Sequence, residues 1–272
     1  MKKVIYENAC NSHLHIIDPA FPNDGKATSQ TGTVGEYRAL ADKMGIARAV
    51  FVQAKPFGVD NSCLLDAIRR FGYDKSRGIA VVSDRVSDAE ILRLHEAGVR
   101  GLRFSLWNPK NAVVSFDMCF SLSERTRELG WNTQFHMSAA QLKEYAPGIE
   151  RIAGNVVIDH MGRLDPALGT KDPVFSLICR WIDRGRTWMK LSGPYLNTLQ
   201  GYPWEDADCV ARAFASYAPE RVVWGNDFPH VTEAVKPDED ALAETIDRWF
   251  PNERGKYLAL VENPAQLYGF GE

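Results

Sequence analysis

The sequence predicts a single (β/α)8 barrel, and two patterns along its 272 residues support this fold class. Short apolar runs rich in β-branched residues recur, and each is followed by a polar cluster and then by apolar residues at helical spacing. Polar residues also end nearly every run. Eight strand–helix units in a chain of this length favour a closed parallel barrel, because every strand then has two neighbours and every apolar helix face packs on the sheet.

Seven apolar runs are the expected strands, and a first strand ending near His15 makes eight. The runs cover 47–53, 78–83, 99–104, 132–136, 156–160, 188–192 and 221–226. The expected helices are the amphipathic stretches 61–71, 88–97, 121–129, 175–184 and 207–217. An open doubly wound sheet is the alternative, but no glycine-rich phosphate loop follows the first strand, which favours the barrel.

Composition limits the number of domains and the class of partner. No linker, low-complexity tract or close repeat divides the chain, so residues 1–272 are expected to form one domain. The 32 Lys and Arg and the 35 Asp and Glu are interspersed, which excludes a basic stripe for nucleic acid. Five widely spaced cysteines without a CxxC pair are typical of reduced thiols, so a cytoplasmic location is expected. No apolar run is long enough for a membrane span, and the oligomeric state is left open.

Histidines and an aspartate stand at the carboxyl ends of three expected strands. His13 and His15 alternate along the first strand, so both imidazoles point to the same side, into the barrel mouth. His160 ends the sixth strand and Asp227 ends the eighth. Because the strand ends of a parallel barrel converge on one face, these four side chains are expected to share a rim and to form the catalytic centre. The alternative is a structural role in which Asp227 only orients a histidine.

Further polar side chains are expected around the same mouth as substrate-binding groups. Arg103 lies inside an apolar strand, where an unpaired guanidinium would be costly, so it indicates an anionic or carbonyl ligand. Lys55 and Asn61 are equally compatible with solvated loop positions. The full expected set is Gln53, Lys55, Asn61, Arg103, His136, Arg163 and His230.

Seven motifs spread along the chain together resemble one known family. They are HxH (13–15), VQ…G.DN (52–61), GLRF (101–104), DHMGR (159–163), KLSGP (190–194), WGNDFPH (224–230) and NPAQLYGF (263–270). In combination they resemble the amidohydrolase-related family of 2-pyrone-4,6-dicarboxylate lactonase over essentially the whole chain. The resemblance implies a distorted (β/α)8 barrel of the amidohydrolase superfamily that hydrolyses a small lactone without a bound metal or other cofactor.

The resemblance also implies roles for the rim residues. Asp227 is the general base that takes a proton from water, and the three histidines of the rim polarise the lactone carbonyl. Arg103 and Arg163 hold a carboxylate of the substrate. The geometry expected from the residues agrees, because a carboxylate among imidazoles is a suitable base and donors aimed at an oxyanion can replace a Lewis acid.

The chain departs from the family pattern at the mouth. Trp-Asn-Pro at 107–109 and Tyr-Leu-Asn at 195–197 stand where the family places further arginines, His136 stands in place of a tyrosine, and Lys55 in place of a serine. Fewer guanidiniums favour a less anionic substrate, such as a sugar-acid lactone or a monocarboxylate, over the pyrone dicarboxylate.

Three other functions remain as alternatives. D-galactarolactone isomerase, a related family member, moves the lactone ring and has asparagine at the strand-eight position, so Asp227 favours hydrolysis. A mononuclear Zn²⁺ enzyme would use HxH, His136 and Asp227 as ligands with His160 close by, although the guanidinium of Arg103 would repel a cation. A barrel that binds a sugar acid as a sensor is the non-enzyme alternative.

Overall fold

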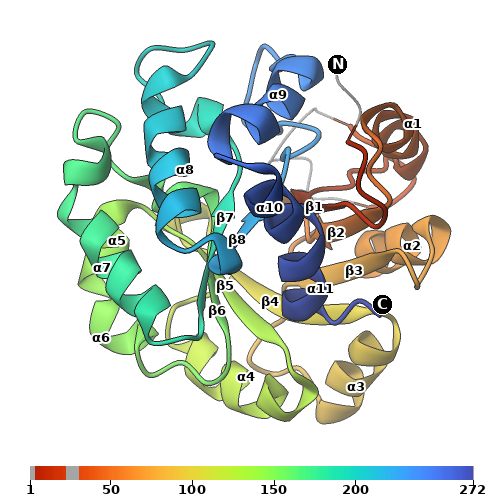
Figure 1. Ribbon diagram of the computed structural model, residues 1–272. Coiled ribbons are helices and arrows are strands. Elements are labelled where there is room, and N and C mark those ends of the chain that lie inside the picture. The colour runs from red at the N-terminus through yellow and green to blue at the C-terminus, as the bar shows by residue number, and fades with distance from the viewer. Residues whose placement is uncertain (1–3, 23–30, 272) are drawn as a thin grey trace.

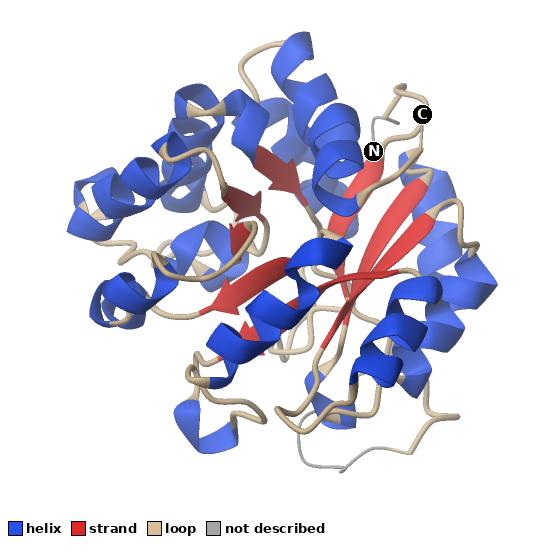
Figure 2. Cartoon of the chain, turned by 90° about the horizontal axis from the view of Figure 1, so that it is seen from below, coloured by secondary structure: helices blue, strands red, loops and turns tan. Residues whose placement is uncertain are grey.

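The computed structural model describes residues 4–22 and 31–271, which form a parallel barrel surrounded by helices (Figures 1 and 2). Eight strands pair in sequence order, and each neighbouring pair is parallel. The strands are β1 (Cys10–Leu14), β2 (Arg48–Val52), β3 (Ser76–Ala80), β4 (Val99–Ser105), β5 (Asn132–His136), β6 (Val156–Ile158), β7 (Thr187–Leu191) and β8 (Val222–Trp224). The predicted fold class is therefore confirmed.

The first and last strands meet at their carboxyl ends, along what we call the β1–β8 seam. The backbone N–H of His15 donates to the carbonyl of Phe228 over 2.7 Å, and the N–H of Asp227 donates to the carbonyl of His13 over 2.9 Å. Gly225 permits this approach, because a Cβ atom there would lie 2.7 Å from the Cβ atom of His13. The seam therefore passes directly beside the predicted catalytic residues.

Helices follow the strands and turn their apolar faces toward the barrel. Helix α1 begins with a capping box between Thr33 and Glu36, and α7 begins with Pro173 after the capping side chain of Asp172. The helices are α1 (Val34–Met44), α2 (Ser62–Phe71), α3 (Asp88–Glu96), α4 (Met118–Thr126), α5 (Ala139–Glu144), α6 (Ala146–Ile149), α7 (Pro173–Asp183), α8 (Glu205–Tyr217), α9 (Glu239–Trp249), α10 (Glu253–Tyr257) and α11 (Asn263–Tyr268).

The predicted elements match the observed ones with shifts of a few residues. The predicted helix 121–129 is α4 followed by a 3₁₀ turn at Arg127–Leu129. The third strand was predicted at 78–83, but β3 ends at Ala80. The side chain of Asn61 binds both the N–H and the carbonyl of Val81, so the chain leaves the sheet there although its sequence stays apolar.

The amino end of the barrel is closed by the C-terminal segment, which follows α11. Phe270 packs with the inward-facing apolar residues of the strands. The guanidiniums of Arg48 and Arg77 stack on the Phe270 ring at 5.1 and 4.5 Å, and they donate to the carbonyls of Gly271 and Gly269. A functional site is thus confined to the opposite, carboxyl end of the strands.

The five cysteines are unpaired thiols, of which Cys209 is exposed and the other four are buried. In the part of the chain that the structure describes, no helix has the length and apolarity needed to cross a membrane.

Candidate active site at the barrel mouth

The four predicted catalytic residues lie together where β1, β6 and β8 end. His13 belongs to β1, whereas His15, His160 and Asp227 follow their strands within three residues. The ring centroid of His13 lies 5.1 Å from that of His15 and 4.6 Å from that of His160. His160 and Asp227 have φ angles of 51° and 64°, in a left-handed region that side-chain-bearing residues seldom adopt outside functional or tightly constrained turns.

The carboxylate of Asp227 is contacted on both oxygens. Oδ1 lies 3.4 Å from Nε2 of His13 and 3.5 Å from Nε2 of His15, while Oδ2 accepts a 2.7 Å hydrogen bond from the phenol of Tyr195. Burial alone raises the pKa of the Asp227 carboxyl, but the imidazole of His160 and those of His15 and His13 outweigh burial and hold this pKa well below its usual range. Asp227 is therefore ionised at neutral pH, as a general base requires.

The hydrogen positions on His13 and His15 follow from what their Nδ1 atoms contact. Nδ1 of His15 lies 2.9 Å from the carbonyl oxygen of Val52, which only accepts, so this Nδ1 carries a hydrogen. Nδ1 of His13 lies 3.0 Å from Nζ of Lys190, whose ammonium only donates, so the hydrogen of His13 is on Nε2. His13 thus presents an N–H to Asp227, and the neutral form of His15 would have its lone pair on Nε2.

A buried cluster of charges lies beneath the mouth. Nε of Arg103 donates to Oδ2 of Asp159 over 2.9 Å, and Nζ of Lys190 lies 3.3 Å from Oδ1 of the same carboxylate. Asp159 therefore supplies a protein counter-charge for Arg103, and the predicted contact of Arg103 with a ligand stays a prediction. With Asp227 included, two carboxylates balance two cations, so the cluster is formally neutral.

Asp159, Lys190 and Tyr195 are the residues that sequence reasoning missed. Lys190 stands inside an apolar strand, which is the signal that identified Arg103, and Asp159 directly precedes His160 in an equally apolar run. Both could have been found by asking which charges a barrel strand would bury. Tyr195 lies in a loop, and its contact with Asp227 depends on a loop conformation that no sequence pattern indicates.

Burial makes the site's bases weaker than usual. It lowers the pKa of His160 to about 4, although Asp227 and Asp159 oppose the shift. Burial and the Lys190 ammonium hold the pKa of His13 well below its usual range, and burial and Arg103 do the same for His136. The pKa of Lys190 falls to about 8, again through burial and against the attraction of Asp159. At neutral pH the lysine is therefore charged and these three imidazoles are neutral.

The mouth opens into a cavity of about 390 Å³. His15, His160 and Asp227 line it, whereas His13 is fully buried just below. Lys55, Arg103 and His136 line it as predicted, together with Ser105, Trp107, Leu196 and Thr232. A volume of this size suits a small ring with a few substituents.

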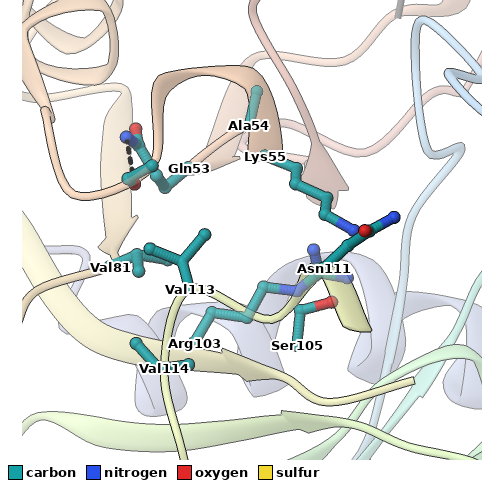
Figure 3. Close-up of a pocket in the computed structure, with 10 residues that line it drawn as sticks. Gln53, Ala54, Lys55, Val81, Arg103, Ser105, Asn111, Val113 and Val114 are labelled. Atoms are coloured by element: carbon teal, nitrogen blue, oxygen red, sulfur yellow. Dashed lines mark hydrogen bonds between the residues drawn. The ribbon is translucent and has the colours of Figure 1, made fainter. Parts of the chain in front are cut away.

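A smaller side pocket of about 30 Å³ adjoins this cavity and shares Lys55, Arg103 and Ser105 with it. Figure 3 shows Lys55 and Arg103 extending toward Asn111 on one side of the pocket, with three valines on the other. These valines are Val81, Val113 and Val114. Arg103 thus reaches the ligand space from β4, and Lys55 reaches it from the 3₁₀ turn (Lys55–Phe57) that follows β2.

Trp107 and His136 form a wall of the cavity, with their rings nearly parallel at 10° and their centroids 6.0 Å apart. Nδ1 of His136 lies 3.0 Å from the hydroxyl of Ser105, and its Nε2 is buried without a partner among the described residues. The guanidinium of Arg163 lies 3.8 Å from the centre of the Trp107 ring. Burial lowers the pKa of Arg163 to about 10, so it remains a cation. The contact with Trp107 places Arg163 against the wall of the cavity, and its predicted role as a carboxylate holder stays a prediction.

Two other predicted substrate ligands, Gln53 and Asn61, hydrogen-bond to the protein's own backbone. The amide nitrogen of Gln53 donates to the carbonyls of Gly58 and Asp60, so Gln53 fixes the loop after β2 and reaches only the side pocket. The amide nitrogen of Asn61 donates to the carbonyls of Val59 and Val81, and its amide oxygen accepts from the N–H of Val81. These two side chains hold loops, and neither is a free donor in the main cavity.

His230 lies behind Tyr195 and is buried. Its Nε2 lies 2.9 Å from a carboxylate oxygen of Glu239, and its Nδ1 lies 3.0 Å from the phenol oxygen of Tyr195. Because Tyr195 in turn contacts Asp227, His230 acts on the site through the tyrosine. The prediction that it binds substrate is therefore corrected.

The zinc alternative requires ligand atoms that lie close together and that have free lone pairs. One ligand atom each from His13, His160 and Asp227 can be chosen so that all lie within 4.8 Å of one another, which suits a metal in position. The hydrogen arrangement does not suit it, because Lys190 leaves a hydrogen on the His13 nitrogen that faces Asp227. The cluster is also already neutral, so a divalent ion would add two uncompensated buried charges.

Comparison with known proteins identifies the family to which the chain belongs. The amidohydrolase family model matches residues 10–270. The chain is 32% identical to 2-pyrone-4,6-dicarboxylate hydrolase of Comamonas testosteroni, covering 96% of this chain and 90% of that protein. It is 27% identical to D-galactarolactone isomerase of Agrobacterium fabrum, with the same coverage. An apo crystal structure from Agrobacterium tumefaciens superimposes with a TM-score of 0.89 at 26% identity, covering 98% of this chain and 97% of that one.

Proposed function

We propose, from the premise that this chain belongs to the amidohydrolase family, that it hydrolyses a small carboxylated lactone by general-base activation of water and without a metal. The observation that carries the proposal is the ionised Asp227 at the floor of the cavity. Tyr195 fixes one carboxylate oxygen, and the other faces His13 and His15. The relatives named as lactone hydrolase and lactone isomerase support lactone chemistry.

Asp227 and His15 are arranged to hold the attacking water. Oδ1 of Asp227 and Nε2 of His15 lie 3.5 Å apart, and the neutral form of His15, with its hydrogen on Nδ1, has a lone pair on Nε2 beside that of the carboxylate. A water molecule has two hydrogens and can donate one to each atom, which leaves its oxygen free to attack the lactone carbonyl carbon. As the new C–O bond forms, Asp227 takes the proton from that water.

The same carboxyl completes the reaction. The tetrahedral intermediate expels the ring oxygen, the ring C–O bond breaks, and the proton on Asp227 passes to the departing oxygen. The product is a hydroxy acid, and Asp227 is again a carboxylate. During attack, the guanidinium of Arg103, which lines the cavity, is the donor placed to stabilise negative charge on the carbonyl oxygen, while the N–H on Nε2 of His13 faces Asp227 from below.

The cavity supports a substrate with modest negative charge. Lys55 and Arg103 are the cations among its described lining residues, and part of the charge on Arg103 is already neutralised by Asp159. The wall formed by Trp107 and His136 is flat and uncharged at neutral pH. We therefore propose a sugar-acid lactone or a monocarboxylated lactone in preference to a dicarboxylate.

Isomerisation is the second candidate, because one relative is named as a lactone isomerase. Both reactions start at the lactone carbonyl, and they differ in the nucleophile. Hydrolysis uses water, whereas isomerisation uses a hydroxyl of the substrate. The facing lone pairs of Asp227 and His15 favour a bound water as the nucleophile.

A panel of carboxylated lactones separates the two reactions. Turnover is followed with a pH indicator and the product is identified by NMR, because hydrolysis releases acid and isomerisation does not. Asp227→Asn should lower kcat by about 10²- to 10⁴-fold and retain lactone binding, as expected for the loss of a base. Asp84→Asn, at an exposed surface position, is the matched control. Unchanged kcat in Asp227→Asn would refute the assigned base.

Metal independence needs its own test. Protein treated with a chelator and shown by elemental analysis to be metal-free should turn over the lactone as fast as untreated protein. One tightly held metal per chain, with activity that depends on it, would overturn this part of the proposal and leave the lactone assignment in place.

A further inference from the structure

Lys190 is fully buried, and a chain of hydrogen bonds sets the direction of its donors. The backbone carbonyl of Arg100 accepts from Nδ2 of Asn132 over 2.9 Å, so Oδ1 of Asn132 is turned to accept from Nε2 of Gln134 over 2.7 Å. Oε1 of Gln134 then accepts from Nζ of Lys190 over 2.5 Å. Because the chain starts at a carbonyl, which only accepts, the direction of each bond in it is fixed.

The rest of the ammonium is directed at the site. Nζ lies 3.3 Å from Oδ1 of Asp159 and 3.0 Å from Nδ1 of His13. Three acceptors therefore surround the three hydrogens of the ammonium. This leaves Nδ1 of His13 as an acceptor and puts the imidazole hydrogen on Nε2, the atom that faces Asp227.

The spacing at this point is that of a metal site. Ligand atoms about 2.1 Å from a zinc ion stand about 3.4 Å apart in tetrahedral geometry. Nε2 of His13 and Oδ1 of Asp227 are 3.4 Å apart, and a ligand atom of His160 completes a group within 4.8 Å. The positions of these ligand atoms therefore suit a metal ion. The hydrogen on Nε2 of His13 prevents metal binding, because a nitrogen that carries a hydrogen has no lone pair for a metal.

We propose that Lys190 is the residue that excludes a divalent metal from this barrel, by donating to Nδ1 of His13 and so placing a hydrogen where a metal needs a lone pair. Without Lys190, a hydrogen on Nδ1 of His13 has an acceptor at Oδ1 of Asp159, 3.6 Å away. Nε2 of His13 is then free to bind a metal, in the carboxylate–histidine–metal arrangement that orients many metal-bound histidines.

The net charge of the cluster would also favour a metal ion once Lys190 is removed. The wild-type cluster holds two carboxylates and two cations. Removing the lysine leaves one excess negative charge near His13 and Asp227, which a divalent cation would more than offset. The inference goes beyond the proposed function, since it concerns which ligand the site rejects and does not depend on lactone turnover.

Cobalt binding tests the proposal directly. Co²⁺ is added at pH 7 to chelator-treated protein, and visible absorption reports coordination by nitrogen and oxygen ligands. Lys190→Met, which keeps the length and removes the ammonium, should bind one Co²⁺ per chain about 10- to 100-fold more tightly than wild type. Adding His160→Ala to this variant should abolish the gain. Lys143→Met, at an exposed position, should behave as wild type.

Imidazole nitrogen NMR provides the second readout, with His13 assigned by comparison with His13→Gln. Wild type should show a hydrogen on Nε2 of His13, and Lys190→Met should show it on Nδ1. The proposal is overturned if wild type carries the hydrogen on Nδ1, or if folded Lys190→Met binds Co²⁺ no more tightly than wild type. The wild-type spectrum decides the first point even if the variant does not fold.

Discussion

Replacing Tyr195 with phenylalanine should raise the pKa of the proposed base, Asp227, and the size of the effect follows from one contact.

 The phenol donates to Oδ2 of Asp227 over 2.7 Å, and burial and the nearby Asp227 carboxylate raise the pKa of Tyr195 well above its usual value, so the donor hydrogen stays in place. A hydrogen bond to a charged group contributes about 1.5–3 kcal/mol. At about 1.4 kcal/mol per pKa unit, its loss should raise the pKa of Asp227 by about one to two units.

The pH dependence of kcat/KM measures this shift. A base must be deprotonated to act, so its activity falls as the pH drops through its pKa, and the acidic limb of Tyr195→Phe should lie about one to two pH units above that of wild type. Tyr217→Phe is the matched control, because that phenol contacts the carboxylate of Asp183 on the surface. An acidic limb that stays at the wild-type pH would refute the reasoning, even if the variant were slower at every pH.

Three further substitutions test separate parts of the structure. Asp159→Asn removes the counter-charge of Arg103 and Lys190, so the free energy of unfolding measured in urea should fall by about 3–5 kcal/mol. A loss below about 1 kcal/mol would show that the stability of the protein does not depend on these ion pairs. Phe270→Ala should cost about 3–5 kcal/mol in the same assay and leave KM unchanged, because it opens a cavity at the amino end of the barrel; a changed KM would contradict that separation. Trp107→Ala removes a cavity wall and an Arg163 stacking contact of about 1 kcal/mol, so KM should rise about fivefold with little change in kcat, and an unchanged KM would place the wall outside the binding site.

The sequence was informative for residues whose place in the site depends only on the strand to which they belong or which they follow. His13 and His15 alternate on one strand, and Asp227 closes another, so barrel topology alone predicts their meeting. Polar side chains that hydrogen-bond to the backbone of loops were instead predicted to bind substrate. Asn61 is polar and close to the mouth, but it holds Val81, and only the loop conformation reveals this.

Buried charges were the other source of error. The reasoning that singled out Arg103 assumed that its counter-charge came from a ligand, yet Asp159, which directly follows β6, two strands further around the barrel, supplies it. Such a pairing joins residues 56 positions apart in the chain. The identity of a cation in an apolar strand predicts that a partner exists, but only the register of the strands shows which residue it is.

The β1–β8 seam makes the chemistry depend directly on closure of the barrel. The backbone N–H groups of His15 and Asp227 donate the hydrogen bonds that join the two ends of the sheet. Any fluctuation that parts these strands therefore separates the carboxylate from the imidazole beside it, so a molecule with an open seam has no assembled catalytic pair. Amide hydrogen exchange at these two positions would count, in the resting protein, the fraction of molecules ready to react.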